Sequence, residues 1–306
     1  MDSQFGRELA RFGPNTRRRP MSRAQAQAYC SHLARTHYEN FSVATLLLPR
    51  RLTRHFHNVY AWCRWADDLG DETGGGPHAL ELLRWWRQEL FHCFQGQPQH
   101  PVTIALADTI RRFHLPMQPF LDLLFAFEQD QLIKRYASYA QLLEYCRHSA
   151  NPVGRLVLYL CEVFDEDRAV LADHICTALQ LTNFWQDVAR DFACGRIYVP
   201  EEDWQRFGYT RADWQARRFN LAFVNLMRFQ VERARDLFYR GFPLVERMPV
   251  ELRPDIELFI QGGLAILRKI EQCNCNVWAQ RPVLTPLDKV RLLVGVLGKR
   301  LRTALF

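Results

Sequence analysis

The sequence contains few lysines and no long apolar run. Only 4 of its 40 basic residues are lysine, so 36 are arginine, the side chain that binds carboxylate or phosphate through two parallel hydrogen bonds. With 33 acidic residues among 306, the formal net charge is +7, which favours an anionic partner without identifying it. No segment approaches the roughly 18 apolar residues in a row that a membrane-spanning helix needs. The N-terminus lacks the apolar stretch of a secretory signal, so we expect a cytoplasmic protein.

The cysteines do not form a recognisable framework. There are nine of them, and an odd, scattered set argues against the disulfides of a secreted domain. Cys273 and Cys275 form a C-x-C pair, but no second pair lies at zinc-ligand spacing. We expect them to be ordinary thiols.

The chain also lacks the strict apolar/polar alternation of half-buried strands and the fixed repeat of a solenoid. Helical spacing of apolar residues predominates instead. We expect a flexible, arginine-rich arm over residues 1–20, followed by one all-α domain over residues 21–306. The expected helices cover 22–36, 53–71, a stretch through 85–86, 101–113, 116–132, 138–150, 153–163, 167–192, 219–240, 254–279 and 286–303.

Residues 288–306 are apolar with interspersed cations. One interpretation is a terminal helix packed on the rest of the domain. The other is a basic amphipathic helix that rests on an anionic membrane surface, which would make the protein membrane-peripheral.

Two carboxylates, Asp67 and Asp71, lie one turn apart near the end of an expected helix. They differ by about 40° around the axis and share a face, with Arg64 one turn before them. Like charges at this spacing repel each other, and the helix dipole is unfavourable there, so a divalent cation would stabilise them. The alternative is a pair of solvated charges at the entry to the glycine-rich loop 74–76.

Asn183, Asp187 and Asp191 follow one another at intervals of four residues and form a stripe along a second expected helix. Gln180 lies one turn earlier on the same side, and the neighbouring residues are large and apolar. Because buried carboxylates without partners are costly, we expect this stripe to line a cleft. The alternative is a stripe that faces solvent.

Together the two segments predict a magnesium site. Mg²⁺ prefers oxygen ligands and is typically held by a few carboxylates and the phosphate oxygens of a substrate. Two facing helices with these side chains would hold several Mg²⁺ ions around one diphosphate and neutralise it as a leaving group. Arginines close to the segments in sequence are expected to complete the cradle: Arg50, Arg51, Arg64 and Arg190.

These segments resemble the motifs of the squalene/phytoene synthase family, the head-to-head class of isoprenyl diphosphate synthases. The family's D-x-x-x-D motif matches Asp67 and Asp71, and its N-x-x-x-D-x-x-x-D motif matches Asn183, Asp187 and Asp191. Further matches, in chain order, are Tyr60, Arg64, Tyr145, Cys146, Ala150, Val153, Gly154 and the run Gly195 to Pro200. The resemblance implies a single-domain isoprenoid synthase fold, with helices around a central apolar cavity.

The resemblance also implies roles for individual residues. The five motif residues would bind the metal, and Tyr60, Arg64 and Tyr145 would be catalytic. Diphosphate or substrate contacts would come from His37, Phe41, Arg50, Arg51, Gln180, Arg190, Arg196 and Tyr198. Aromatic side chains would stabilise cationic carbon through their π faces, although helix packing is the alternative role for each: Phe41, Tyr60, Tyr145, Phe184 and Trp185.

The segment His37-Tyr38-Glu39-Asn40-Phe41 indicates which member of the family this chain resembles most. Other members usually carry a serine-rich H-x-x-S-F here, whose hydroxyls touch diphosphate, so a serine contact is in doubt for this chain. H-Y-E-N-F followed by L-P-R-R resembles the bacterial hopanoid-pathway member. Glu39 or Asn40 would position a water molecule; alternatively, Glu39 pairs with an arginine.

The function implied is that of a hydroxysqualene synthase, a carbon–oxygen lyase. Presqualene diphosphate would ionise with Mg²⁺, the cation would rearrange, and water would quench it, without NADPH. No dinucleotide fingerprint is present. The expected partners are an isoprenyl diphosphate and other enzymes of the pathway, with no nucleic acid.

Three other interpretations remain. The same motifs would serve a presqualene diphosphate synthase that condenses two farnesyl diphosphates or, more remotely, a phytoene synthase. A catalytically inactive helical scaffold would not need five oxygen ligands at metal spacing. Nucleic-acid binding is suggested only by the net charge and by Arg17-Arg18-Arg19, without a recognised motif.

Overall fold

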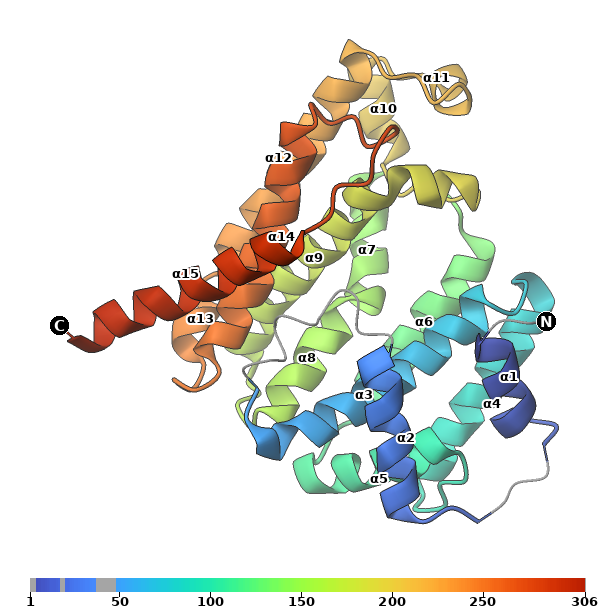
Figure 1. Cartoon of the computed structure of the whole chain (residues 1–306). Helices are drawn as coiled ribbons and strands as arrows, with labels where there is room; N and C mark the ends of the chain where they lie inside the picture. Colours follow the sequence, from blue (N-terminus) through green and yellow to red (C-terminus); the bar gives the residue numbers. More distant parts are fainter. Residues whose placement is uncertain (1–3, 17–19, 37–47, 306) are drawn as a thin grey trace. The chain divides into compact units, whose positions relative to one another are not determined.

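The computed structural model describes residues 4–16, 20–36 and 48–305 (Figure 1). Within these residues the chain is all-α: no strand is present, and one isolated bridge pairs Arg135 with Ile197. The contacts divide the chain into two compact units, and helix α8 (Asn151–Leu160) contributes to both. Among the described helices, none combines the length and apolar content needed to span a bilayer.

Unit 1 comprises the described parts of residues 4–36, 49–133 and 155–164. Its helices are α1 (Gln4–Phe12), α2 (Arg23–Thr36), α3 (Arg50–Asp71), α4 (Gly76–Phe94), α5 (Pro101–Phe113) and α6 (Gln118–Leu132).

Helix α3 is the centre of unit 1 because α2, α4, α5 and α6 all pack against it. Trp62 and Trp65 on its inner face are buried, and the ring of Trp65 stacks on that of Trp86 from α4, with 5.4 Å between the centroids. Burying large apolar side chains of this kind stabilises by about 1.5–3 kcal/mol each. The core therefore fixes the half of α3 that carries Asp67 and Asp71.

Helix α1 lies in the arm that the sequence analysis expected to be flexible. Phe5 is buried and its ring meets Trp65 edge to face at 5.1 Å. The hydroxyl of Tyr29 donates a hydrogen bond to Glu8 at 2.8 Å. The expectation of a flexible arm is thus wrong for residues 4–12, because one buried aromatic ring is enough to attach this short segment to unit 1.

Unit 2 comprises residues 48, 134–154 and 165–305 of the described chain. Its helices are α7 (Tyr139–Ser149), α9 (Glu166–Ala193), α10 (Glu201–Phe207), α11 (Arg211–Gln215), α12 (Leu221–Gly241), α13 (Leu244–Arg247), α14 (Arg253–Gln272) and α15 (Pro286–Leu305).

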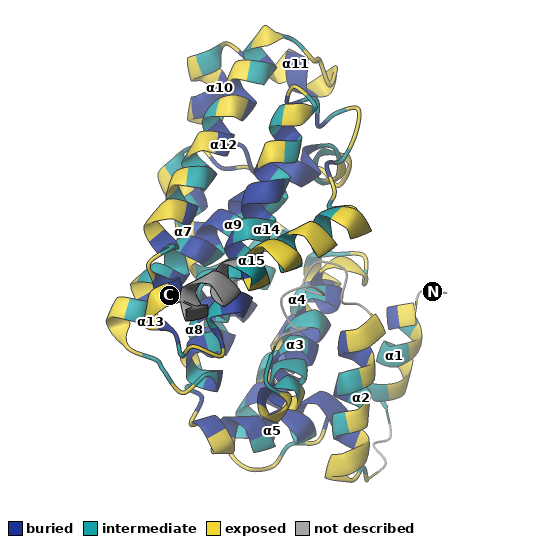
Figure 2. Cartoon of the chain, turned by 60° about the vertical axis from the view of Figure 1, so that its left-hand side comes forward, coloured by how far each residue is buried: buried dark blue, intermediate teal, exposed yellow. Residues whose placement is uncertain are grey.

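Helix α9 is the centre of unit 2, with α7, α12, α13 and α14 packed on it. It begins where the carboxylate of Asp165 accepts a hydrogen bond from the Arg168 amide at 2.7 Å, which caps the helix. A Cβ at Gly241 of α12 would lie 2.5 Å from Cγ1 of Ile175, so this glycine allows the two helices to approach closely. Figure 2 shows α9 largely buried, whereas α15 is exposed along much of its length.

The end of α14 and the segment after α9 differ most from the expectation. The expected helix 254–279 ends at Gln272, because Asn274 and Cys275 adopt positive φ angles of 52° and 62° and leave the right-handed helical region. The short helices α10 and α11 were not expected, although Thr210 and Asp213 form a capping box, a pattern that the sequence itself contains.

Candidate active site

The first acidic motif lies at the C-terminal end of α3, where Arg64 is surrounded by carboxylates. Its Nη1 lies 3.5 Å from Oδ2 of Asp67, and its Nη2 forms an ion pair with Asp68 and lies 3.5 Å from Oε1 of Glu72. Asp67 is half-exposed and Asp71 is exposed. Arg64 therefore neutralises part of a carboxylate cluster that is larger than the sequence motif.

Asp68 is the buried carboxylate of this cluster, and the sequence analysis did not select it. It is 3% exposed, and burial raises its pKa to about 7, although the Arg64 guanidinium acts in the opposite direction. Asp67 and Glu72 add repulsion that also raises this pKa. The available signal was its position four residues after Arg64, the spacing of a helical ion pair.

The other expected site residues on α3 lie further from the acids. Tyr60 is half-buried one turn before Arg64, whereas Arg50 and Arg51 are exposed in the first turn of the helix. Asp67 follows Arg51 by 16 residues, so the two are about 24 Å apart along the axis. Contact of these two arginines with diphosphate stays a prediction.

The second motif lies in the last third of α9. Asp187 is 8% exposed, while Asn183 and Asp191 are half-buried. The carboxylate of Asp187 accepts two hydrogen bonds from Arg281: one from Nε to Oδ1, and one from Nη2 to Oδ2 at 2.9 Å. The stripe is therefore neither wholly buried nor wholly exposed to solvent. Its central carboxylate, Asp187, forms an ion pair with Arg281.

Arg281 belongs to the connection between α14 and α15, residues 280–285, which we name the C-terminal strap. The side-chain amide of Gln186 donates a hydrogen bond to the carbonyl oxygen of Pro282, so two consecutive residues of α9 hold the strap. Sequence reasoning missed Arg281 because 94 positions separate it from Asp187, and one of 36 arginines carries no local signal.

Four aromatic rings gather beside the second motif. Phe184 stacks on Tyr198 with 3.7 Å between ring centroids and 7° between planes, and Tyr145 and Tyr136 lie 5.9 Å and 5.7 Å from Tyr198. All four are buried. Tyr145 and Tyr198 were expected at the site, and the structure brings them together in unit 2. Tyr136 belongs to the same cluster but was not expected there.

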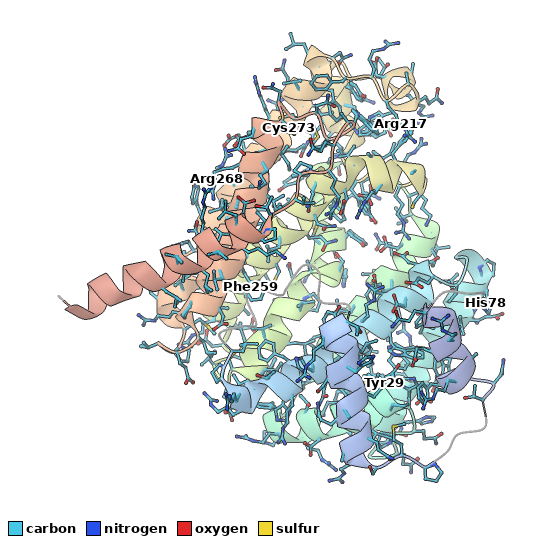
Figure 3. The ribbon with its side chains drawn as sticks, in the orientation of Figure 1. Tyr29, His78, Arg217, Phe259, Arg268 and Cys273 are labelled. Carbon is cyan, nitrogen blue, oxygen red and sulfur yellow. The ribbon has the colours of Figure 1, made fainter. Side chains whose placement is uncertain are left out.

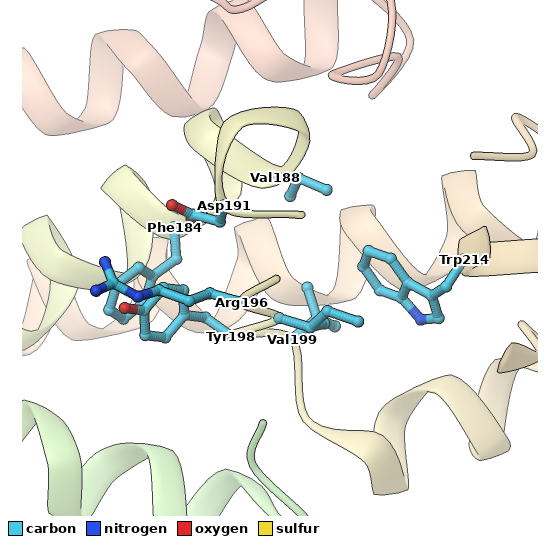
Figure 4. Close-up of a pocket in the computed structure, with 8 residues that line it drawn as sticks. Phe184, Val188, Asp191, Arg196, Tyr198, Val199 and Trp214 are labelled. Atoms are coloured by element: carbon cyan, nitrogen blue, oxygen red, sulfur yellow. The ribbon is translucent and has the colours of Figure 1, made fainter. Parts of the chain in front are cut away.

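The run that follows α9 folds back onto the end of the motif. Gly195 has φ +77°, which permits the reversal. The Arg196 amide then donates to the carbonyl oxygen of Asp191 at 2.8 Å, and the Ile197 amide to that of Lys134 at 2.9 Å. Figure 4 shows the small cavity here, lined by Asp191, Arg196 and Tyr198 among others. Its volume of about 10 Å³ is roughly that of one water probe.

The remaining expected residues divide into two groups. Gln180 is half-buried one turn before Asn183, and Arg190 is exposed beside Asp191. His37, Glu39, Asn40 and Phe41 lie outside the described residues.

The donor atoms of both motifs suit a hard divalent cation, because carboxylate and amide oxygens are the ligands that Mg²⁺ prefers. Among the described residues, no three His, Cys, Asp or Glu side chains gather as a metal-binding group. Each motif by itself offers two or three oxygen-bearing side chains on one helix. The donor chemistry therefore fits magnesium, and a complete coordination sphere would need ligands from elsewhere.

Comparison with known proteins identifies the family. The family described as "Squalene/phytoene synthase" matches residues 34–288. A phytoene synthase from Arthrospira platensis is 31% identical, with 90% of this chain and 94% of that protein covered. A 15-cis-phytoene synthase from Synechocystis is 30% identical, and the match covers 88% of this chain and 83% of that protein.

Solved structures agree with these relatives. The crystal structure of squalene synthase HpnC from Alicyclobacillus acidocaldarius has 43% identity and a TM-score of 0.79, covering 84% of this chain and 97% of that one. A dehydrosqualene synthase in complex with ligand has 27% identity and a TM-score of 0.82, covering 92% and 98%. The all-α isoprenoid synthase fold is confirmed by these neighbours, and the chain belongs to the squalene/phytoene synthase family.

Proposed function

We propose that this protein converts presqualene diphosphate to hydroxysqualene in squalene and hopanoid biosynthesis. The family acts on isoprenyl diphosphates. The observation that carries the finer assignment is the 43% identity to squalene synthase HpnC over 84% of the chain. The H-Y-E-N-F and L-P-R-R sequence segments support the same assignment.

The reaction exchanges diphosphate for a hydroxyl group. The carbon–oxygen bond to diphosphate breaks, the resulting cyclopropylcarbinyl cation rearranges, and a water oxygen bonds to the cationic carbon and loses a proton. No electron transfer is needed, so we expect no NADPH. Mg²⁺, held by the oxygens of Asp67, Asp71, Asn183, Asp187 and Asp191, would supply charge neutralisation for the departing diphosphate.

The residues of the chain contribute electrostatics and shape. Arg64 and Arg196 would bind diphosphate oxygens, since a guanidinium donates two parallel hydrogen bonds to such groups. Arg50, Arg51, Gln180 and Arg190 would extend this contact.

The rings of Phe184, Tyr198 and Tyr145 cluster beside the second motif, and we propose that π faces of this cluster meet the cationic carbon. Desolvated faces of this kind stabilise a cation by about 2 kcal/mol. The hydrocarbon chains would occupy a long apolar cavity that excludes water.

Substrate choice is tested by incubating the purified protein with Mg²⁺ and presqualene, farnesyl or geranylgeranyl diphosphate in separate reactions, followed by mass spectrometry of the extracted lipids. Hydroxysqualene from presqualene diphosphate alone is the expected result. Asp191→Asn should lower turnover by about 100-fold, whereas Asp167→Asn, an exposed position on the same helix, should not.

The second candidate is a condensing enzyme. The curated relatives at 27–31% identity are named phytoene synthases, which favours a reaction that joins two isoprenyl diphosphates. Formation of presqualene diphosphate from farnesyl diphosphate, or of phytoene from geranylgeranyl diphosphate, would replace the first proposal with this one.

Glu39 and Asn40 are proposed to position the quenching water. The reason is their polar character in a segment where relatives of the carotenoid type carry serine. Product analysis of Glu39→Ala tests this role: an unchanged yield of hydroxysqualene at a near-normal rate would exclude it.

A further inference from the structure

Helix α15 carries an exposed apolar stripe. Leu287, Val290, Val294 and Leu297 are 58%, 55%, 64% and 37% exposed. At 100° per residue these four positions fall within about 80° of one another around the helix axis. From first to last they extend about 15 Å, and Val283 just before the helix is 45% exposed as well. The stripe is therefore one continuous feature rather than scattered apolar residues.

The opposite side of α15 is the one that packs. Val296 is 2% exposed, and it lies about 140° around the axis from the middle of the stripe. Helix α14 provides the contacts on that side. Unit 2 thus holds α15 by one face and leaves the apolar stripe on the other.

Positive charge borders the stripe. Residues 286–305 contain five cations (Lys289, Arg291, Lys299, Arg300, Arg302) and one acid (Asp288), a net charge of 5 − 1 = +4. Arg291 is exposed and lies about 80° from the centre of the stripe, at its edge. An apolar face with cations alongside is the pattern of a helix that binds an anionic lipid surface.

A cleft of about 230 Å³ lies directly beside this edge, between α14 and α15. Arg268, Gln272 and Arg291 line it and are exposed, and Figure 3 shows Arg268 on α14. Lys269, also at the cleft, forms an ion pair with Asp288 at 2.8 Å. Two guanidinium groups and an amide in one cleft suit the phosphate of a lipid headgroup.

We propose that α15 docks unit 2 on an anionic phospholipid surface, with the stripe in the acyl boundary and a headgroup phosphate in the cleft. A second copy of the chain is the competing occupant, because the 3-4-3 spacing of the stripe is also that of a helix–helix seam. Pairing two copies would bring two helices of charge +4 together, whereas an anionic bilayer complements that charge. The proposal does not depend on which isoprenyl diphosphate the enzyme uses.

The test is cosedimentation of the full-length protein with vesicles of phosphatidylcholine, with and without phosphatidylglycerol. The wild type should bind the anionic vesicles and lose binding as salt increases. Val290→Asp/Val294→Asp should weaken binding by at least about tenfold, and Arg268→Gln by about fivefold, the usual effect of one cation near such a surface.

The matched control is Leu221→Asp/Val170→Asp, which changes two apolar residues of unit 2 that are 72% and 52% exposed and belong to α12 and α9. It should bind like the wild type, and circular dichroism should show that all variants are folded. Equal binding of the stripe variant and the control would overturn the proposal. The proposal would also be overturned if the wild type does not bind vesicles but forms a dimer in sedimentation velocity, and the stripe variant abolishes that dimer.

Discussion

The pairing of Arg281 with Asp187 predicts that Arg281→Ala destabilises the protein even though the change lies in a connection between helices. The substitution leaves a carboxylate that is 8% exposed without the cation that faces it. Removing one partner of a fully buried pair costs about 3–5 kcal/mol. Because the Arg281 side chain is 24% exposed, water replaces part of the lost contact, and we expect about 2 kcal/mol.

The assay is urea unfolding in EDTA, arranged as a double-mutant cycle with Asp187→Asn. If the two side chains stabilise each other, the double variant should lose less free energy of unfolding than the two single variants added together, by about 2 kcal/mol. Added Mg²⁺ should restore part of the stability of Arg281→Ala, because a ligand that binds only the folded protein stabilises it.

Two results would refute this reasoning. A loss below about 0.5 kcal/mol for Arg281→Ala would mean that the pair contributes no more than an ordinary surface ion pair. Additive single variants would mean that the two residues act independently.

Further predictions concern packing, protonation and the metal. Gly263→Ala should lower the melting temperature, because a Cβ there would lie 2.1 Å from Cζ of Phe238 and overpacking costs about 1–3 kcal/mol. The neighbouring Gly262 has nothing within 4 Å of such a Cβ. Gly262→Ala should therefore increase the free energy of unfolding by up to about 1 kcal/mol. The pKa of Asp68 rises from 3.8 to about 7 on folding, so its contribution to stability is full below the lower value and is lost as pH increases through about 7. The melting temperature of the wild type should therefore decline relative to that of Asp68→Asn between about pH 4 and 7 and level off above it, and parallel curves would contradict the shift. EDTA should abolish turnover and added Mg²⁺ should restore it; full activity in EDTA would exclude the metal role.

Local sequence patterns were sufficient for most of the fold. The stretch expected to be helical over 167–192 is observed as Glu166–Ala193, because apolar spacing and a capping Asp165 act within a few residues. The end of α14 was placed wrongly because Asn274, a residue type that often takes a left-handed φ just after a helix, was not used as a stop signal.

The candidate site also has a part that local sequence patterns predicted and a part that they did not. Helical spacing placed Asn183, Asp187 and Asp191 on one stripe, since four residues make about one turn. The cation that faces the middle carboxylate was not predictable, because only the folded chain brings the strap to α9. Asp68 was missed for a different reason: periodicity identifies which acids share a face, but it does not indicate which of two adjacent acids is buried.

The strap has a consequence for shortened or fused versions of this protein. A chain ended after α14 would retain every acidic residue by which the motifs are recognised, yet it would lose both Arg281 and the carbonyl oxygen that Gln186 binds. Such a fragment would pass a motif search and still carry an uncompensated carboxylate at the middle of α9. Its integrity should therefore be judged by whether residues 280–285 are present, and deletions from the C-terminal side are best started beyond them.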